Sequence, residues 1–157
     1  MRLAHLILAH HNPLQLERLV KRLRCTLTDV YIHLDGKCDD KEFAHLEQLE
    51  NVFFIRNRTT VTWANYSMIK ATLTSFEEIL KKGITYSHLN LLSGQDYPLK
   101  NPAVIQKFFF DNADKTYMRF RNVEEDWKQI IPRFNLYSLG DYNFPCKFTI
   151  QSFLNLL

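Results

Sequence analysis

The sequence predicts an α/β fold in which a mostly parallel sheet carries helices on both of its faces. Short apolar runs alternate along the chain with segments whose apolar residues recur at helical spacing. The first strand, helix and strand follow one another within about 35 residues, which is typical of a βαβ unit. The 157 residues, 46% hydrophobic and 24% charged, have the composition of one soluble domain that needs neither metal nor disulfides to fold.

The first βαβ unit is predicted over residues 3–35. Residues 3–9 form an almost continuous apolar run, which is typical of a buried strand. Asn12 and Pro13 follow it and favour a helix start, because asparagine caps helices and proline fits the first turn. Residues 29–35 predict a second strand that ends in a polar turn. The apolar positions expected on the inner face of the helix are Leu16, Leu19, Val20 and Leu23.

The same alternation predicts further elements up to residue 120. Helices are expected over residues 41–49, from the polar loop at 56–62 to Gly83, and from Asn101-Pro102 onward. Strands are expected over residues 52–55, 88–92 and 116–120. The positions expected to face inward are Ile69, Leu73, Phe76 and Leu80 in the second of these helices, and Ile105, Phe108 and Phe109 in the third. Beyond Arg121 the pattern weakens.

Charge and cysteine content limit the classes of partner. The net charge of +3 is spread over 20 basic and 17 acidic residues without a basic stripe, so nucleic acid is not an expected partner. Cys25, Cys38 and Cys146 are odd in number and lack metal-ligand spacing, which favours free thiols in a reducing compartment. The apolar run at 3–9 is too short for a signal peptide or a spanning helix. We therefore expect a cytoplasmic location, or peripheral association with a membrane.

Polar clusters follow four of the predicted strands. They are His10-His11-Asn12, Asp35-Gly36-Lys37, Arg56-Asn57-Arg58 and Ser93-Gly94-Gln95-Asp96. Ligands of open parallel sheets bind outside the carboxyl ends of the strands, so we expect these clusters to converge. A helix starting at Pro13 would favour an anion there, Asp35 would accept hydrogen bonds from a uracil edge or a ribose hydroxyl, and Lys37 would contact phosphate. These residues predict a nucleotide site.

The usual nucleotide signatures are absent from the chain. It contains no Gly-x-Gly-x-x-Gly, no P-loop motif, and no Asp-x-Asp pair for metal-dependent diphosphate binding. Structural alternatives also stand beside the site hypotheses. His10, His11 and His33 would then be hydrogen-bonded residues at strand ends, Trp63 a packing residue, Asp96 part of an Asx turn, and residues 124–126 a solvated acidic run.

Four strings in register carry a family resemblance. They are Leu6-Ile7-Leu8-Ala9-His10-His11-Asn12-Pro13, Val30-Tyr31-Ile32-His33-Leu34-Asp35, Val61-Thr62-Trp63 with residues 67–73, and Leu91-Leu92-Ser93-Gly94-Gln95-Asp96-Tyr97-Pro98-Leu99-Lys100. The sequence resembles the core-2/I-branching β-1,6-N-acetylglucosaminyltransferase family, which also includes the peptide O-xylosyltransferases. The resemblance covers residues 3–110 firmly and the remainder loosely.

The resemblance implies the Rossmann-like, nucleotide-binding part of a GT-A glycosyltransferase that inverts the anomeric centre and uses neither a cofactor nor a divalent metal. The implied donor is UDP-N-acetylglucosamine, with UDP-xylose as the alternative, and the implied acceptor is a hydroxyl of a glycan or glycoprotein. The implied donor-binding residues are His10, His11, Asn12, Asp35, Lys37, Trp63, Ser93 and Asp96. The implied acceptor-binding residues are Arg119, Glu125, Trp127 and Lys128.

Two departures from the family pattern affect these expectations. The family usually has two glycines after the tryptophan, where this chain has Ala64 and Asn65. Family members are also much longer, and their second half holds the general base. We therefore expect residues 1–157 to be a single glycosyltransferase domain that lacks the C-terminal half, with the catalytic base beyond Leu157. The alternatives are a non-catalytic module that binds nucleotide-sugars and an α/β domain with another small ligand.

Overall fold

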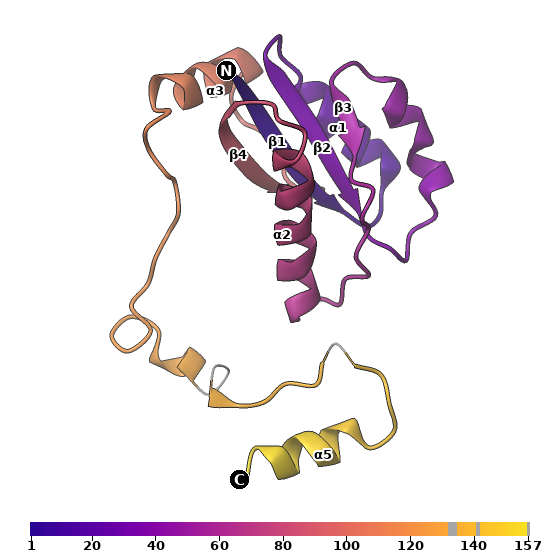
Figure 1. The fold of residues 1–157 in the computed structure, drawn as a ribbon, viewed down its shortest axis with the longest axis vertical. Coiled ribbons are helices and arrows are strands. Elements are labelled where there is room, and N and C mark those ends of the chain that lie inside the picture. Colours follow the sequence, from indigo (N-terminus) through magenta and orange to yellow (C-terminus); the bar gives the residue numbers. More distant parts are fainter. Residues whose placement is uncertain (132–134, 141, 157) are drawn as a thin grey trace. The chain divides into compact units, whose positions relative to one another are not determined.

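A computed structural model describes residues 1–131, 135–140 and 142–156 (Figure 1). The chain divides into two compact units, residues 1–114 and 115–157. The first unit contains the elements β1 (Arg2–Ala9), α1 (Pro13–Leu23), β2 (Thr28–Leu34), the 3-10 helix η1 (Asp40–Gln48), β3 (Val52–Phe54), α2 (Tyr66–Leu80), β4 (Tyr86–Ser93) and α3 (Pro102–Asp111). The second contains the 3-10 helix η2 (Lys128–Ile130) and α5 (Lys147–Leu154).

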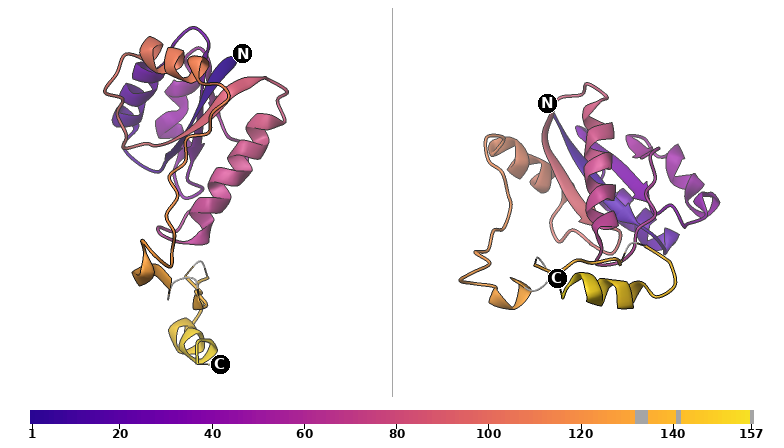
Figure 2. Two further views of the ribbon diagram at one scale, coloured as in Figure 1. Left: turned by 90° about the vertical axis from the view of Figure 1, so that its left-hand side faces the viewer. Right: turned by 60° about the horizontal axis from the view of Figure 1, so that its bottom comes forward.

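The described strands form one parallel sheet in the order β3-β2-β1-β4. Helices cover both faces, with α2 on one side and α1 and α3 on the other (Figure 2). This arrangement confirms the predicted α/β fold with a Rossmann-like parallel sheet. The chain adds β2 and β3 on one side of β1 and then crosses over to add β4 on its other side.

Each face of the sheet has its own buried cluster. Leu16, Leu19, Val20 and Leu23 of α1 are all buried on the first face, as the helical spacing predicts. They pack with side chains of β1, β2, β3 and η1, which are Ile7, Ala9, Val30, Ile32, Leu34, Val52, Phe43 and Leu46. The second face is smaller and buries Ala4, Leu6, Tyr31, Ile55 and Ile79. Most of the core therefore lies between β1, β2 and α1.

The inner face of α2 differs from the prediction. Ile69, Leu73 and Leu80 are more than half exposed, whereas the buried residues are Ala71, Ser75 and Ile79. The small side chains at 71 and 75 let the helix approach the sheet closely, and the Ser75 hydroxyl is satisfied by the Ala71 carbonyl at 2.6 Å. Phe76 packs against the second buried cluster as predicted. Apolar spacing therefore identifies the helix and one of its inward residues but not the other three.

Helix α3 begins as predicted, with the Asn101 side chain accepting a hydrogen bond from the Ala103 amide at 2.9 Å. None of its residues is fully buried, and Phe108 is 47% exposed instead of facing inward. Phe109 does pack on the sheet, against the ring of His88. β4 is the edge strand of the described sheet, and α3 buries none of its own residues fully against it.

The predicted strand at residues 116–120 is wrong. These residues are exposed and carry no regular structure, because no strand among the described residues of the second unit offers them a partner. The short helix α5 lies in the region where the sequence pattern weakens and was not predicted. No helix in the described parts of the chain is long and apolar enough to cross a membrane.

An ionic network stabilises the amino ends of β1, β2 and β4. Asp29 is buried and accepts hydrogen bonds from the Arg2 guanidinium and, at 2.7 Å, from the Tyr86 hydroxyl. The hydroxyls of Tyr86 and Tyr31 lie 2.8 Å apart. Burial and these bonds raise the pKa of Tyr86, and the bond to Asp29 raises that of Arg2. The network therefore ties three strands together at the end of the sheet opposite to the polar clusters.

We predict that Asp29→Ala lowers the free energy of unfolding by about 2 to 4 kcal/mol, because it leaves the partners of a buried carboxylate unpaired. The matched control is Asp111→Ala, which removes an exposed carboxylate paired with Lys107 on α3 and should cost less than about 1 kcal/mol. Urea unfolding followed by circular dichroism measures both. Equal losses in the two variants would contradict the prediction.

Candidate functional site

The site is placed by the order of the strands. The chain passes from β1 through α1 to β2 on one side of β1, and α2 later crosses the opposite face to bring β4 to its other side, which makes the carboxyl ends of β1 and β4 the switch point of the sheet. The two strand ends are in direct contact, because the Gly94 amide donates to the Leu8 carbonyl at 2.8 Å. A Cβ on Gly94 would lie 3.3 Å from the Cβ of Ala9, so a side chain there would force the turn outward.

A hollow of about 350 Å³ opens at the carboxyl ends of β1 and β2. Five of the predicted donor-binding residues line it, namely His10, His11, Asn12, Asp35 and Lys37, together with Cys38, Asp39, Glu42 and Phe43. The structure thus brings together residues that are up to 33 positions apart in the sequence. The hollow combines one buried carboxylate, two imidazoles and an ammonium group.

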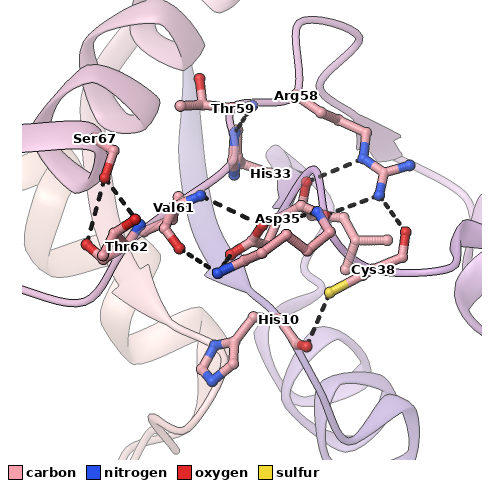
Figure 3. Close-up of polar contacts among 11 residues, drawn as sticks. His10, His33, Asp35, Cys38, Arg58, Thr59, Val61, Thr62 and Ser67 are labelled. Carbon is pink, nitrogen blue, oxygen red and sulfur yellow. Dashed lines mark hydrogen bonds and ion pairs between the residues drawn. The ribbon is translucent and has the colours of Figure 1, made fainter. Parts of the chain in front are cut away.

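Asp35 is the most buried polar residue of the hollow, with 5% of its surface exposed. Its Oδ1 accepts hydrogen bonds from the backbone amides of Lys37, at 2.9 Å, and of Val61, at 3.4 Å (Figure 3). Its Oδ2 lies 3.7 Å from the Lys37 Nζ, which also donates to the Val61 carbonyl at 2.6 Å. The protein therefore orients the carboxylate through Oδ1, and Oδ2 keeps lone pairs for a ligand.

The histidines link the hollow to neighbouring segments. The His10 carbonyl accepts from the Cys38 thiol at 2.9 Å, and burial raises the pKa of this thiol, so it stays protonated and donates. The His10 and His11 rings lie 4.1 Å apart. His11 Nε2 is 3.3 Å from the side-chain nitrogen of Gln95, in the turn after β4. The two imidazoles thus stand between the ends of β1, β2 and β4.

Asn12, which lines the hollow, and two further predicted donor residues, Ser93 and Asp96, have local structural partners. Asn12 has a left-handed backbone, with φ of 56°, and its side chain caps α1 by accepting from the Gln15 amide at 3.1 Å. Asp96 accepts from the Ser93 amide at 2.8 Å, and the Ser93 hydroxyl accepts from the Gln95 amide at 3.2 Å. Asp96 thus bonds the backbone three residues before it, within the turn after β4, and not the position two residues after it that an Asx turn would use, which here is Pro98.

Trp63 does not line the hollow, and 84% of its surface is exposed. It belongs to a turn in which the Asn65 amide donates to the Thr62 carbonyl at 3.2 Å. Ala64 occupies the third position of this turn with φ of 61°, a conformation that favours glycine and costs other residues about 1 kcal/mol. The turn therefore keeps a glycine-like backbone although the chain has alanine.

The predicted acceptor-binding residues all belong to the second unit. Arg119 and Glu125 are exposed, Lys128 begins η2, and Trp127 is half-buried with the Arg121 guanidinium 5.5 Å from its ring centre. The donor and acceptor candidates are thus divided between the two units.

A larger hollow, of about 1070 Å³, lies along the edge strand β3 between η1 and the C-terminal half of α2. It is lined by Arg56, Asn57 and Arg58, so this one of the four polar clusters does not join the smaller hollow as expected. None of the predicted donor- or acceptor-binding residues lines it, and it carries charges of both signs, including Lys41, Lys82 and Glu47. Within the described ranges, no three His, Cys, Asp or Glu side chains come together to hold a metal ion. The chemistry-bearing cluster therefore lies at the smaller hollow.

Sequence reasoning missed the contributions of Arg58, Thr59 and Val61. The polar cluster at residues 56–58 marked this loop, but no sequence signal says that Arg58 donates to backbone carbonyls about 20 residues earlier. His33 was noted only as a hydrogen-bonded strand residue. It accepts from the Thr59 amide at 3.0 Å, and burial lowers its pKa.

Comparisons with known proteins extend this description. Residues 3–149 match the family model of the Core-2/I-Branching enzymes. The chain is 26% identical over 135 residues to the Homo sapiens beta-1,3-galactosyl-O-glycosyl-glycoprotein beta-1,6-N-acetylglucosaminyltransferase, which covers 81% of this chain and 32% of the relative. It is 27% identical over 123 residues to the xylosyltransferase oxt of Drosophila pseudoobscura pseudoobscura, and this alignment covers 76% of this chain and 14% of the relative.

The chain is also similar to an enzyme from Danio rerio, named beta-1,3-galactosyl-O-glycosyl-glycoprotein beta-1,6-N-acetylglucosaminyltransferase 4. The two are 27% identical over 103 residues, and the alignment covers 63% of this chain and 24% of the relative. The chain thus spans about a third or less of the length of these relatives. Its parallel sheet with helices on both faces is consistent with a GT-A fold. Since the match extends over nearly the whole sequence, the chain belongs to the Core-2/I-Branching enzyme family.

Proposed function

We propose that the hollow binds the uridine diphosphate part of a UDP-sugar, and that the chain supplies the donor-binding part of a glycosyltransferase. The observation that carries this proposal is the buried Asp35 carboxylate, oriented through Oδ1 and open at Oδ2, beside Lys37 at the carboxyl ends of a parallel sheet. Oδ2 would accept the N3–H of uracil. The names of the similar proteins support a glycosyl donor.

The diphosphate would lie towards Lys37 and the N-terminal end of α1. A helix N-terminus favours anions, and the Lys37 ammonium, which is more than half exposed, can turn from the Val61 carbonyl to a phosphate oxygen. His10 and His11 line the same hollow and add donors. The Lys37 ammonium and the helix end would thus supply positive charge without a divalent cation.

The proposed reaction is an inverting displacement. A general base takes the proton of an acceptor hydroxyl, the hydroxyl oxygen bonds to the anomeric carbon, and the bond from that carbon to the diphosphate breaks with UDP as leaving group. We propose N-acetylglucosamine as the transferred sugar and a glycan or glycoprotein as acceptor, by analogy with the named relatives. The similarity to xylosyltransferase oxt favours xylose transfer to protein as the second candidate.

The first test is metal independence. We expect calorimetric titration to give the same UDP affinity with EDTA as with Mn²⁺ or Mg²⁺, because the Lys37 ammonium and the N-terminal end of α1 offset part of the charge of the diphosphate. Titration with uridine separates the nucleoside contribution from that of the phosphates. Loss of UDP binding on chelation, with recovery on adding Mn²⁺, would contradict the prediction.

The second test concerns base recognition by Asp35. A carboxylate accepts from the N3–H of uracil but faces the lone pair of cytosine N3, so we expect UDP to bind at least about 10-fold more tightly than CDP. Asp35→Asn replaces one oxygen by a donor, and we expect it to weaken UDP binding by about 1 to 3 kcal/mol and to reduce or reverse the preference over CDP.

Asp39→Asn is the charge-matched control for Asp35→Asn. Asp39 borders the same hollow and caps η1 through the Lys41 amide at 3.0 Å, a bond that asparagine also makes. Removing this negative charge should leave UDP binding unchanged or slightly tighter. If Asp35→Asn behaves like Asp39→Asn, or if UDP and CDP bind equally well, Asp35 does not read the base.

The third test is turnover by the 157-residue chain. We expect it to bind UDP-N-acetylglucosamine and UDP-xylose without sustained release of UDP, because no described carboxylate has the setting of a general base. Asp35 is held by Lys37 and Val61, and Glu124, Glu125 and Asp126 are solvent-exposed. UDP release with a panel of glycan and peptide acceptors measures this. Turnover that Glu125→Gln abolishes and Glu124→Gln preserves would contradict the expectation.

A further inference from the structure

Two loops at the carboxyl end of the sheet are joined by one guanidinium group. Arg58, in the loop of residues 56–62, donates through Nε to the Leu34 carbonyl at 3.2 Å. Its Nη2 donates to the carbonyls of Asp35, at 2.8 Å, and of Cys38, at 2.6 Å (Figure 3). These three carbonyls belong to the turn that carries Asp35 and Lys37. Arg58 itself does not line the hollow of the proposed nucleotide site.

His33 makes a second connection between the same two segments. Its side chain is buried, and its Nε2 accepts a hydrogen bond from the Thr59 amide at 3.0 Å. The Thr59 carbonyl in turn accepts from the Gly36 amide at 3.0 Å. The loop and the turn approach so closely that a Cβ on Gly36 would lie 2.8 Å from the Thr60 hydroxyl oxygen. Only a neutral imidazole can accept this bond, so the contact requires unprotonated His33.

The joined loop orients the groups that face the hollow. Next to Thr59 and Thr60, Val61 donates its amide to Asp35 Oδ1 and accepts the Lys37 ammonium at its carbonyl. If the loop moved away, the carboxylate would lose one of its two amide donors and Lys37 its backbone acceptor. The loop thus determines where both side chains point.

We infer that His33 and Arg58 are positioning residues of the nucleotide site, which fasten loop 56–62 to the Asp35 turn so that Asp35 and Lys37 meet the ligand in a fixed orientation. This inference rests on the proposed function. Neither residue touches the nucleotide. His33 accepts from a backbone amide and Arg58 donates to three backbone carbonyls. Arg58 Nη1 also pairs with the exposed Asp40 carboxylate at 3.4 Å, which holds it to the start of η1.

The role of His33 gives the site a dependence on pH. The charged groups that face its ring are Asp35 at the end of β2, Arg58 in the loop and Glu78 of α2. Burial, helped by the positive charge of Arg58, outweighs the two carboxylates and lowers the pKa of His33 from its ordinary value. Protonation at acidic pH removes the acceptor for the Thr59 amide. At acidic pH the loop should therefore loosen and the affinity for nucleotide should fall. Near neutral pH the His33–Thr59 hydrogen bond should persist and the affinity should be retained.

The experiment compares four variants of the whole chain by two readouts. Hydrogen exchange, corrected for intrinsic rates, reports protection of the Thr59 and Val61 amides without any ligand. Calorimetry reports UDP affinity between pH 5 and 7.5. Arg58→Ala is paired with Arg56→Ala, which removes the same charge from the same loop. The Arg56 side chain makes no hydrogen bond within the described residues, so its loss should leave the loop in place. His33→Leu is paired with His33→Gln, whose amide oxygen can accept from Thr59 and does not titrate.

We expect Arg58→Ala and His33→Leu to lose amide protection at 59 and 61 and to bind UDP about 10-fold more weakly, the factor for about one net hydrogen bond. Arg56→Ala and His33→Gln should retain both properties. The weakening of UDP binding specific to acidic pH should be present in the native chain and smaller in His33→Gln, whose side chain keeps its acceptor at every pH.

Three outcomes would overturn the inference. Loop amides that stay protected in Arg58→Ala and His33→Leu would show that these side chains do not fasten the loop. Lost protection with UDP affinity equal to that of Arg56→Ala would show that the fastening does not serve the site, while the proposed function would stand. Absence of UDP binding by the native chain would refute the proposed function and, with it, the positioning role, whatever the exchange result.

Discussion

The position of β1 between β2 and β4 is the constraint on which the rest of the structure depends. It makes the strand central, so that most of its residues are buried and apolar, and a buried polar residue such as His5 needs a hydrogen-bond partner. It also places β2 and β4 on opposite sides of β1, which makes the carboxyl ends of β1 and β4 a switch point where polar residues can meet a ligand. The amino ends of the same strands have no such opening, and their charged groups satisfy one another through Asp29. One end of the sheet is closed by its own network, and the other is open.

Two buried histidines of this sheet show how similar side chains take different roles. His5 lies in the middle of β1, where burial lowers its pKa to about 4 and its Nδ1 lies 3.0 Å from the side-chain nitrogen of Asn90 on β4. It therefore joins two strands within the sheet. His33 lies near the end of β2 and joins the strand to a loop that has no ladder of its own. The position along the strand, and not the residue type, decides whether the imidazole supports the core or the site.

The sequence predicts the parts of this fold that depend on local pattern. The strands at 3–9 and 29–35, the capped start of α1 and the convergence of residues 10–12 with Asp35 and Lys37 follow from apolar runs, cap residues and the rule for parallel sheets. The buried face of α2 does not follow, because Ala71 and Ser75 are selected by close packing and not by hydrophobicity. Residues 116–120 fail as a strand for a related reason, since a strand exists only where a partner strand does.

The contacts of loop 56–62 lie furthest from what a sequence can reveal. The loop has no regular structure, yet side chains from three elements bind its amides. Glu78 of α2 accepts from the amides of Arg56 and Asn57, His33 from Thr59, and Asp35 from Val61. At the far end, the Ser67 hydroxyl of α2 accepts from the Thr62 amide at 2.9 Å. A loop held in this way needs a particular side chain at each partner position, because backbone amides without acceptors destabilise the folded state. The glycine-like backbone at Ala64 follows directly after this fastened segment, so the same contacts hold the turn that bears Trp63 in its strained conformation.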